Sequence, residues 1–161
     1  MARRWVINAS PLIALSRIEK LALLDVLADD IVVPAAVARE IASPADVTAL
    51  TGAVAALRKA RTEIVPSIDA EVARWDLGAG ETDVLSWARQ QPGFEAIVDD
   101  RAARSCAAAI GVPVRGTLGI LVLAKQEGHL ATIRSVVEAL RERGMYLDHD
   151  LVDTVLALAG E

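Results

Sequence analysis

Short runs of β-forming residues alternate with longer helical stretches along the whole chain of 161 residues, and this alternation most constrains the fold. Between these runs, apolar residues recur at the three- and four-residue spacing of helices. Such alternation is typical of α/β domains with a mainly parallel sheet. The sequence therefore predicts one α/β domain over residues 1–161, with extended segments at residues 5–8, 31–33, 63–66, 96–98 and 112–116.

Serine–proline pairs mark two predicted helix starts. Ser10 before Pro11 predicts an N-cap and first turn directly after the first strand. Residues 43–46 (SPAD) match a capping box, which predicts a helix from Pro44 to about Lys59.

The net charge of the chain limits the kinds of molecule that it can bind. Seventeen Lys and Arg residues against 22 Asp and Glu residues give a formal net charge of −5, so contact with nucleic acid requires a local basic patch or a bound cation. No apolar run approaches the roughly 20 residues that span a bilayer. Cys106 is the single cysteine, which excludes an intramolecular disulfide. We expect a cytoplasmic protein with no membrane partner.

Polar residues collect where the predicted strands end. Because the carboxyl ends of parallel strands share one edge of a sheet, these residues are expected to lie close together: Asn8, Asp99, Asp100 and Thr117. Glu81 shares a helix face with apolar residues, and Glu40 lies beside the apolar stripe of its own helix. Both glutamates are expected at the same edge.

Carboxylates that meet at one edge repel each other, by about 1 kcal/mol at 4 Å in water and roughly 4 kcal/mol near a protein surface. Such a cluster persists if its members are protonated or if a cation lies between them. Oxygen ligands without Cys or His favour Mg²⁺ or Mn²⁺. Because the waters of such an ion can attack phosphorus, the sequence predicts metal-assisted phosphodiester hydrolysis. The predicted catalytic residues are Glu40, Glu81, Asp99 and Asp100, which with Asn8 are also the predicted metal ligands.

Each of these residues also has an ordinary structural explanation. Glu81 suits a helix N-terminus, where the dipole stabilises an acid. Asp100 suits the N-cap of a helix that starts at Arg101. Asn8 suits the backbone groups after the first strand, and Glu40 suits a solvated helix flank. Only the joint placement of the four argues for a site.

Three arginines are candidates for phosphate binding. Arg101 and Arg104 flank the acidic pair, and Arg115 lies at the end of the next strand. Ordinary surface arginine is the alternative for all three. Thr117 either caps its helix or donates a hydrogen bond to metal-bound water.

Five segments in order carry a resemblance that extends over nearly the whole chain: VINASPLIALSRIEKLALL, the helix from Pro34 to Glu40, LGAGETDVLSWA, IVDDRAARSCAAAIGVPVRGTLGILVLAK and GMYLDHDLVDTVLALAGE. Together they resemble PIN-domain proteins, above all the branch described as predicted nucleic-acid-binding PIN-like proteins. The resemblance implies a three-layer α/β/α fold with a mainly parallel sheet, an acidic cavity for Mg²⁺ or Mn²⁺, and cleavage of single-stranded or structured RNA. It also implies a toxin of a toxin–antitoxin pair, with a small antitoxin protein and a homodimer as partners.

The resemblance also implies site residues. The first acidic position falls at Asn8, with Ser10 as the small hydroxyl residue beside it. The second and third positions fall at Glu40 and Glu81. The fourth falls at Asp100 or its neighbour Asp99, and the spacing to the following helix favours Asp100. Ser10 and Thr117 join the three arginines as the predicted nucleic-acid-binding set.

Asn8 departs from the family pattern, which has aspartate at this position. An asparagine offers a carbonyl oxygen but carries no charge and cannot act as a base. The alternative function is therefore a catalytically weakened PIN-like protein that binds nucleic acid or docks a partner. A nucleotide-binding domain is disfavoured because LGAGE (Leu77–Glu81) lacks the G-x-G-x-x-G pattern. A receiver-type domain is disfavoured because the pair Asp99–Asp100 comes late in the chain and no lysine ends a following strand.

Overall fold

A computed structural model describes residues 2–42 and 47–161, without the side chains of residues 47–49. In this part of the chain, five parallel strands form one sheet in the order β3-β2-β1-β4-β5. The strands are β1 (Arg4–Ile7), β2 (Asp30–Pro34), β3 (Ala60–Glu63), β4 (Phe94–Ile97) and β5 (Val114–Arg115). The predicted α/β class with a parallel sheet is confirmed.

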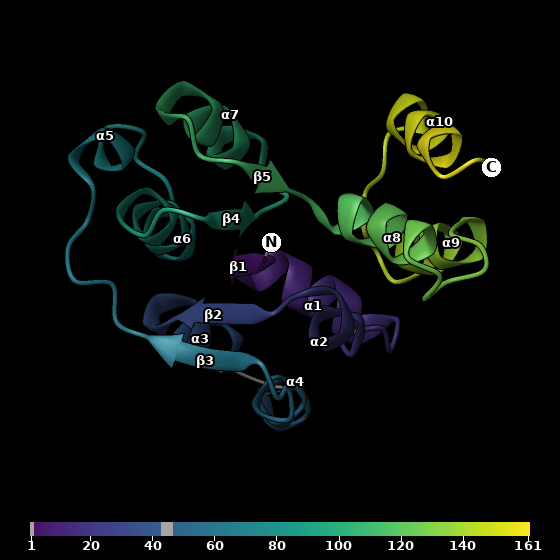
Figure 1. The fold of residues 1–161 in the computed structure, drawn as a ribbon, viewed down its shortest axis with the longest axis horizontal. Coiled ribbons are helices and arrows are strands. Elements are labelled where there is room, and N and C mark those ends of the chain that lie inside the picture. Colours follow the sequence, from purple (N-terminus) through teal and green to yellow (C-terminus); the bar gives the residue numbers. More distant parts are fainter. Residues whose placement is uncertain (1, 43–46) are drawn as a thin grey trace.

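Helices flank the sheet and complete a three-layer α/β/α fold (Figure 1). Helix α6 packs against β1, β2 and β4, and contacts α3, α5 and α7. A second group is formed by α1, α2 and α8, and α10 packs on α8. The helices are α1 (Ala9–Arg17), α2 (Leu23–Leu27), α3 (Ala35–Ile41), α4 (Val47–Ala55), α5 (Ala70–Ala73), α6 (Ala79–Gln90), α7 (Arg101–Ile110), α8 (Thr117–Gln126), α9 (Arg134–Glu142) and α10 (His149–Leu158).

The central strand β1 lies at the middle of the core. Trp5, Val6 and Ile7 are all 0% exposed, because β1 pairs with β2 on one side and with β4 on the other. An unbroken apolar run is the pattern expected of a parallel strand covered on both faces. The chain passes from β1 to β2 and β3 on one side, and later to β4 and β5 on the other. This reversal opens a crevice at the carboxyl ends of β1 and β4, where ligands bind in open α/β sheets.

The bounds of all five strands differ from the predicted segments, and those of β3 differ most. The segment 63–66 was expected to be extended, whereas β3 covers Ala60–Glu63, and β4 begins at Phe94, ahead of the predicted 96–98. Strand β3 is an edge strand with exposed Arg61 and Thr62, so it lacks the apolar run that marks a buried strand. The apolar Ile64 lies beyond it and is 79% exposed.

One of the two expected helix starts is corrected, and the other lies outside the described residues. Helix α1 begins at Ala9 with Asn8 at the N-cap position, so Ser10 lies inside the first turn and does not cap. The capping box predicted at residues 43–46 lies outside the described residues, and α4 is described from Val47. Among the described residues, no helix combines the length and the apolar character that a bilayer crossing requires.

Candidate functional site

Asn8 lies at the carboxyl end of β1 with its side chain turned away from the helix that it precedes. The residue is 1% exposed, and its backbone N–H donates to Ile97 O at 3.0 Å, which holds it against β4. Its side chain makes no capping bond to α1. Instead, Nδ2 donates to Glu81 Oε1 at 3.2 Å, and Oδ1 has no hydrogen-bond partner among the described residues. A buried polar oxygen without a partner is rare and calls for a ligand or water.

Glu40 and Glu81 reach the same place from two different helices. Glu81 is in the first turn of α6, and Glu40 is near the end of α3, which contacts α6. Gly80 leaves the space between them open. The position that a Cβ would take on Gly80 lies 2.8 Å from Glu40 Oε2 and 2.9 Å from Asn8 Oδ1. Any other residue here would block the point where these oxygens converge.

The surroundings of Glu40 in the protein disfavour its charged form. Burial of the carboxyl raises the pKa of Glu40, and repulsion by Glu81 raises it further. The Glu40 residue as a whole is exposed, so water reaches the edge of this cluster. Asn8, Glu40 and Glu81 thus form what we call the uncompensated cluster: two repelling carboxylates beside an unpartnered amide oxygen.

Asp99 is held by α8. Its Oδ1 accepts a hydrogen bond from Thr117 N at 2.7 Å, and its Oδ2 accepts one from Thr117 Oγ1 at 2.6 Å. Thr117 is fully buried and is the first residue of α8, with Gly116 at the N-cap position. The interpretation of Thr117 as the helix cap is therefore wrong. Asp99 supplies the capping carboxylate from β4, and its charge suits the positive end of the helix dipole.

Asp100 caps α7. Its Oδ2 accepts a hydrogen bond from Ala103 N at 2.9 Å, so its ordinary structural explanation is confirmed. Asp100 is exposed and also faces the groove that holds Glu81. Capping leaves a carboxylate with further lone pairs, so the cap and a ligand role are compatible.

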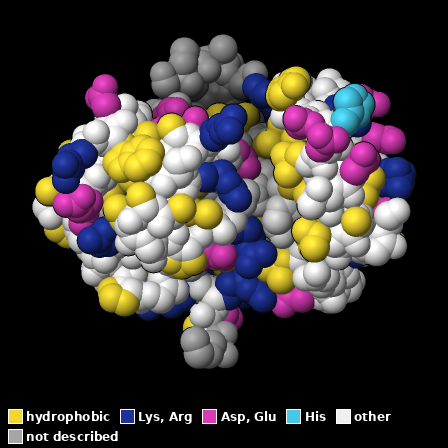
Figure 2. Space-filling view, turned by 90° about the horizontal axis from the view of Figure 1, so that it is seen from above, with side chains coloured by type: hydrophobic (Ala, Val, Ile, Leu, Met, Phe, Trp, Pro, Cys, Tyr) yellow, Lys and Arg dark blue, Asp and Glu magenta, His cyan; other side chains and the backbone are white. Residues whose placement is uncertain are grey.

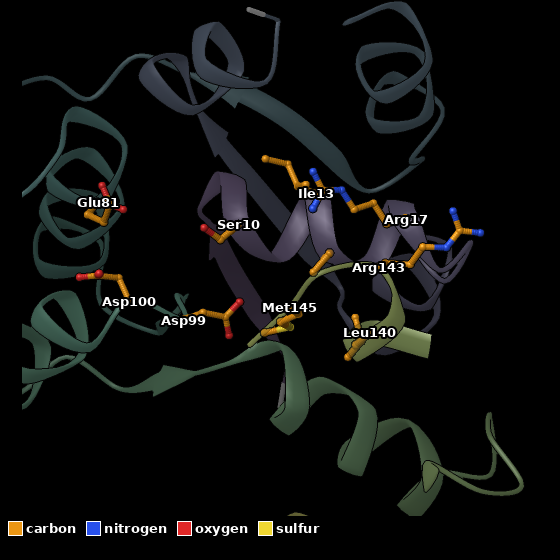
Figure 3. A pocket seen from close by; sticks show the side chains of 10 residues that line it. Ser10, Ile13, Arg17, Glu81, Asp99, Asp100, Leu140, Arg143 and Met145 are labelled. Carbon is orange, nitrogen blue, oxygen red and sulfur yellow. The ribbon is translucent and has the colours of Figure 1, made fainter. Parts of the chain in front are cut away.

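A groove of about 490 Å³ joins these acids to two arginines (Figure 3). Glu81, Asp99 and Asp100 line one end, Arg17 and Arg143 line the other, and Ser10 lies between them. The remaining wall is apolar and comes from Ile13, Ala14, Leu140 and Met145. We call this groove the catalytic groove, after the role that we propose for it below. Glu40 lines a neighbouring cavity of about 380 Å³, which Glu81 also lines.

The sequence interpretation missed Arg17 and Arg143. Arg17 lies seven residues after Ser10 on α1, a spacing that places both on one helix face, so this signal was present. Arg143 follows α9, and nothing in the sequence ties it to residues more than a hundred positions away. Both arginines are exposed, and neither forms an ion pair within the described chain.

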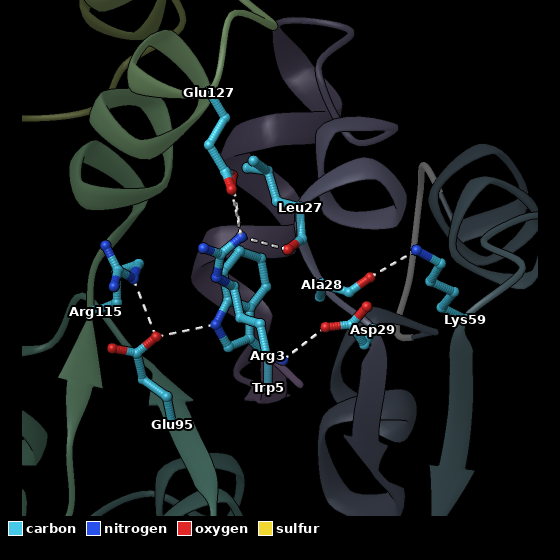
Figure 4. A network of polar contacts seen from close by, with 9 residues as sticks. All are labelled: Arg3, Trp5, Leu27, Ala28, Asp29, Lys59, Glu95, Arg115 and Glu127. Carbon is cyan, nitrogen blue, oxygen red and sulfur yellow. Dashed lines mark hydrogen bonds and ion pairs between the residues drawn. The ribbon is translucent and has the colours of Figure 1, made fainter. Parts of the chain in front are cut away.

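The three arginines singled out from the sequence lie elsewhere. Arg104 donates through Nη1 to Val98 O at 3.2 Å, and Arg101 is exposed at the start of α7. Arg115 pairs through Nε with Glu95 at 3.0 Å, and Glu95 also accepts from Trp5 Nε1 at 2.9 Å (Figure 4). None of the three lines the catalytic groove.

The uncompensated cluster fits a hard divalent cation by its donor chemistry. Among the described residues, no three Asp, Glu, His or Cys side chains are close enough to form a ready-made metal site. The amide oxygen of Asn8, however, is buried without a partner beside two carboxylates. Oxygen donors of this kind suit Mg²⁺ or Mn²⁺ rather than Zn²⁺.

Comparison with known proteins agrees with this geometry. A family model described as PIN domain matches residues 4–161. A search of curated proteins gave no match. PIN domains have a nuclease-type fold and are generally metal-dependent, in keeping with an acidic edge at the switch point of the sheet. The match covers nearly all of the sequence, and the chain therefore belongs to the PIN-domain family.

Proposed function

We propose that this chain is a Mg²⁺- or Mn²⁺-dependent ribonuclease. The buried, unpartnered Asn8 Oδ1 beside Glu40 and Glu81 is the observation that supports the proposal most directly. In this proposal the uncompensated cluster holds the cation, and Asp99 and Asp100 contribute from the same end of the catalytic groove as Glu81. When bound, a divalent cation supplies positive charge that stabilises a phosphodiester oxygen and lowers the pKa of a water molecule.

Glu81 holds the key position in this proposal because it lines both the catalytic groove and the cavity of Glu40. Its Oε1 accepts from Asn8 Nδ2, which fixes the orientation of the amide and turns Oδ1 toward Gly80. A carboxylate at this point orients donors toward the cation and accepts a proton from a nearby water. Ser10, between the two ends of the groove, is placed to donate a hydrogen bond to substrate.

The basic end of the catalytic groove supports a phosphate-bearing substrate. Arg17 and Arg143 keep their guanidinium groups free of carboxylate partners within the described chain. Guanidinium groups bind phosphates through two parallel hydrogen bonds. Their attraction is local, which suits a chain with a net charge of −5. One RNA phosphate on these arginines would place a neighbouring phosphate near the acids.

Several finer assignments belong to the same proposal. Arg101, Arg104, Arg115 and Thr117 remain proposed nucleic-acid-binding residues outside the basic end of the groove. The resemblance to PIN toxins supports a toxin role, a small antitoxin partner and a homodimer. Co-purification of a small protein encoded by a neighbouring gene would support these partners. Purification from the native cell as a lone monomer would contradict them.

A second candidate function is a PIN-like protein that binds RNA with weakened turnover. Asn8 favours it, because the amide carries no charge and its Nδ2 occupies one oxygen of Glu81. Replacing Asn8 with Asp places a third carboxylate beside Glu40 and Glu81. Without metal, Asn8→Asp should destabilise the fold by about 1–3 kcal/mol, the cost of leaving a buried group unsatisfied. We expect the variant to gain more thermal stability from Mn²⁺ than the natural chain does. Cleavage that appears only in this variant would favour the weakened protein.

The test of the nuclease proposal is cleavage of a fluorescent single-stranded RNA with and without Mn²⁺. Glu81→Gln should lower the cleavage rate by at least about 100-fold, the lower end of a general-base contribution, while the melting temperature stays within a few degrees. Glu138→Gln, on the exposed face of α9, is the matched control and should cleave as the natural chain does. Full activity of Glu81→Gln would contradict the proposal.

A further inference from the structure

A second groove meets the catalytic groove at Asp99 and Met145. It has a volume of about 510 Å³ and lies between the β5–α8 junction and the segment that leads into α10. Asp99 and Met145 line both grooves, so the two are neighbours across the acidic edge. We call the second one the distal groove. The two grooves are therefore adjacent, with Asp99 and Met145 at their common border.

Tyr146 is the most exposed large apolar side chain described. It is 90% exposed, is the only tyrosine in the chain, and lines the distal groove directly after Met145. Leu151, 48% exposed, lines the same groove. An aromatic ring held at the rim of a groove, rather than packed into the core, offers a free face to a ligand.

The distal groove also offers positive charge. Arg104 and Arg115 both line it. Arg104 uses Nη1 for Val98 O, and Arg115 uses Nε for Glu95, so each guanidinium keeps further N–H donors. Lys and Arg side chains gather in the furrow between the half of the molecule with α7 and the half with α10 (Figure 2). These two guanidinium groups favour an anionic backbone over a cationic partner.

We propose that Tyr146 is a stacking platform for an unpaired nucleobase of an RNA strand that runs from the catalytic groove past Asp99 into the distal groove. The inference rests on the proposed function, since it assigns the path of the same substrate. Bases in a duplex are stacked and paired, so a protein ring reaches a base only in single-stranded or looped RNA. We therefore expect Tyr146 to contact an unpaired nucleotide of the substrate.

The residues along this path indicate which part of the RNA strand each of them binds. Arg17 and Arg143 bind the backbone at one end, and Arg104 and Arg115 bind it at the other. Phosphate contacts of this type position a strand without reading its sequence. Stacking tolerates every base, because each has a π-face. Tyr146 therefore fixes the position of the strand and not its sequence.

The test measures binding apart from cleavage. Fluorescence anisotropy with a labelled single-stranded RNA is measured in the Glu81→Gln background, with Tyr146→Ala, Tyr146→Phe and Trp75→Ala added in turn. Tyr146→Ala should weaken binding by about 5- to 150-fold, the range for loss of one stacked base. Tyr146→Phe should bind as the background does, since the ring remains. Trp75 is 40% exposed and lines neither groove, so Trp75→Ala is the control and should have no effect.

A second measurement identifies the stacked nucleotide. Single abasic positions are scanned along the RNA, and the loss caused by Tyr146→Ala should vanish when the abasic position faces residue 146. Unchanged binding by Tyr146→Ala would overturn the inference, and the proposed ribonuclease would still stand if Glu81→Gln abolishes cleavage. Unchanged RNA binding together with a smaller particle in gel filtration would also overturn it, because Tyr146 would then belong to a contact between copies. Failure of the natural chain to bind RNA at all would overturn both proposals.

Discussion

Two groups of acidic residues share the carboxyl edge of the sheet, and they differ in how the protein stabilises their charges. Asp99 and Asp100 each accept hydrogen bonds from the start of a helix, α8 and α7 respectively. Glu40 and Glu81 instead repel each other beside the unpartnered Asn8 Oδ1. The first group is satisfied by the protein itself. The second lacks a counter-charge, so it gains most from a bound cation.

This contrast shows that position at a sheet edge does not by itself define a metal ligand. Asp99 and Asp100 fix the two helices that border the catalytic groove, and their carboxylates face that groove as a consequence. Glu81 needs no hydrogen bond from its own helix, so its carboxylate is free to turn toward Asn8. Mutation can therefore separate the structural role of Asp99 and Asp100 from the ligand role that we propose for Glu81.

Thr117→Val should show the largest effect on stability. The substitution keeps the shape of the side chain but removes the hydroxyl that donates to Asp99. We expect the free energy of unfolding to fall by about 1.5–3 kcal/mol, the value of a hydrogen bond to a charged group. Chemical denaturation measures this loss.

The matched control for that loss is Thr154→Val. The Thr154 hydroxyl donates to Asp150 O on the exposed surface of α10, so its removal should change stability by less than about 0.5 kcal/mol. Thr117→Ser keeps the hydroxyl and should retain most of the stability. Equal losses for Thr117→Val and Thr154→Val would show that the Thr117 hydroxyl adds nothing to the hold of α8 on Asp99.

Two substitutions at Asp100 distinguish its role as a helix cap from the role of its negative charge. Asp100→Ala should lower the free energy of unfolding by about 1 kcal/mol through loss of the α7 cap. Asp100→Asn should keep the stability, because asparagine caps equally well, but lose metal-dependent cleavage if the carboxylate serves the cation. RNA cleavage and thermal melting are measured on both variants. Full cleavage by Asp100→Asn would leave Asp100 with its capping role alone.

Glu40→Gln should show the smallest effect on the free energy of unfolding. It should stabilise the fold, whereas Thr117→Val and Asp100→Ala should destabilise it. The pKa of Glu40 is raised in the folded protein, so the folded state binds this proton more tightly, and ionisation above the ordinary pKa of 4.5 destabilises the fold. Without metal, Glu40→Gln should therefore raise the free energy of unfolding at pH 7, by up to about 0.5 kcal/mol for so exposed a residue. The gain should disappear as the pH falls below 4.5.

Denaturation at pH 7 and at pH 3.5, with Glu138→Gln as the exposed control, checks the sign. Adding Mg²⁺ should reverse the order of the natural chain and Glu40→Gln, because the cation compensates the charge that glutamine lacks. Lower stability of Glu40→Gln at pH 7 in the absence of metal would mean that Glu40 already has a partner in the protein.

Much of the fold could be predicted from the sequence because its main signals are local. The apolar run of β1 and its burial follow from a parallel strand covered on both faces, and the Asp100 cap lies directly before its helix. Strand β3 was misplaced because an edge strand carries polar residues. Ser10 was mistaken for a cap because the pattern of a hydroxyl before proline does not show that Asn8 already occupies that position.

The candidate site was harder to predict from the sequence because its contacts join distant parts of the chain. The pairing of Asp99 with Thr117 depends on β4 and β5 being neighbours, and no local pattern shows that the threonine donates to the aspartate. Arg143 reaches the catalytic groove only through the packing of the C-terminal helices. That Asn8 bonds to Glu81 is likewise a property of the folded chain.

The most direct test of the central claim is the position of Mn²⁺ in crystals of the protein, read from its anomalous scattering. We predict a peak within about 2.5 Å of Asn8 Oδ1 and of a Glu81 carboxylate oxygen, absent from crystals of Glu81→Gln. A peak that contacts neither Asn8 nor Glu81, or that persists unchanged in Glu81→Gln, would contradict it.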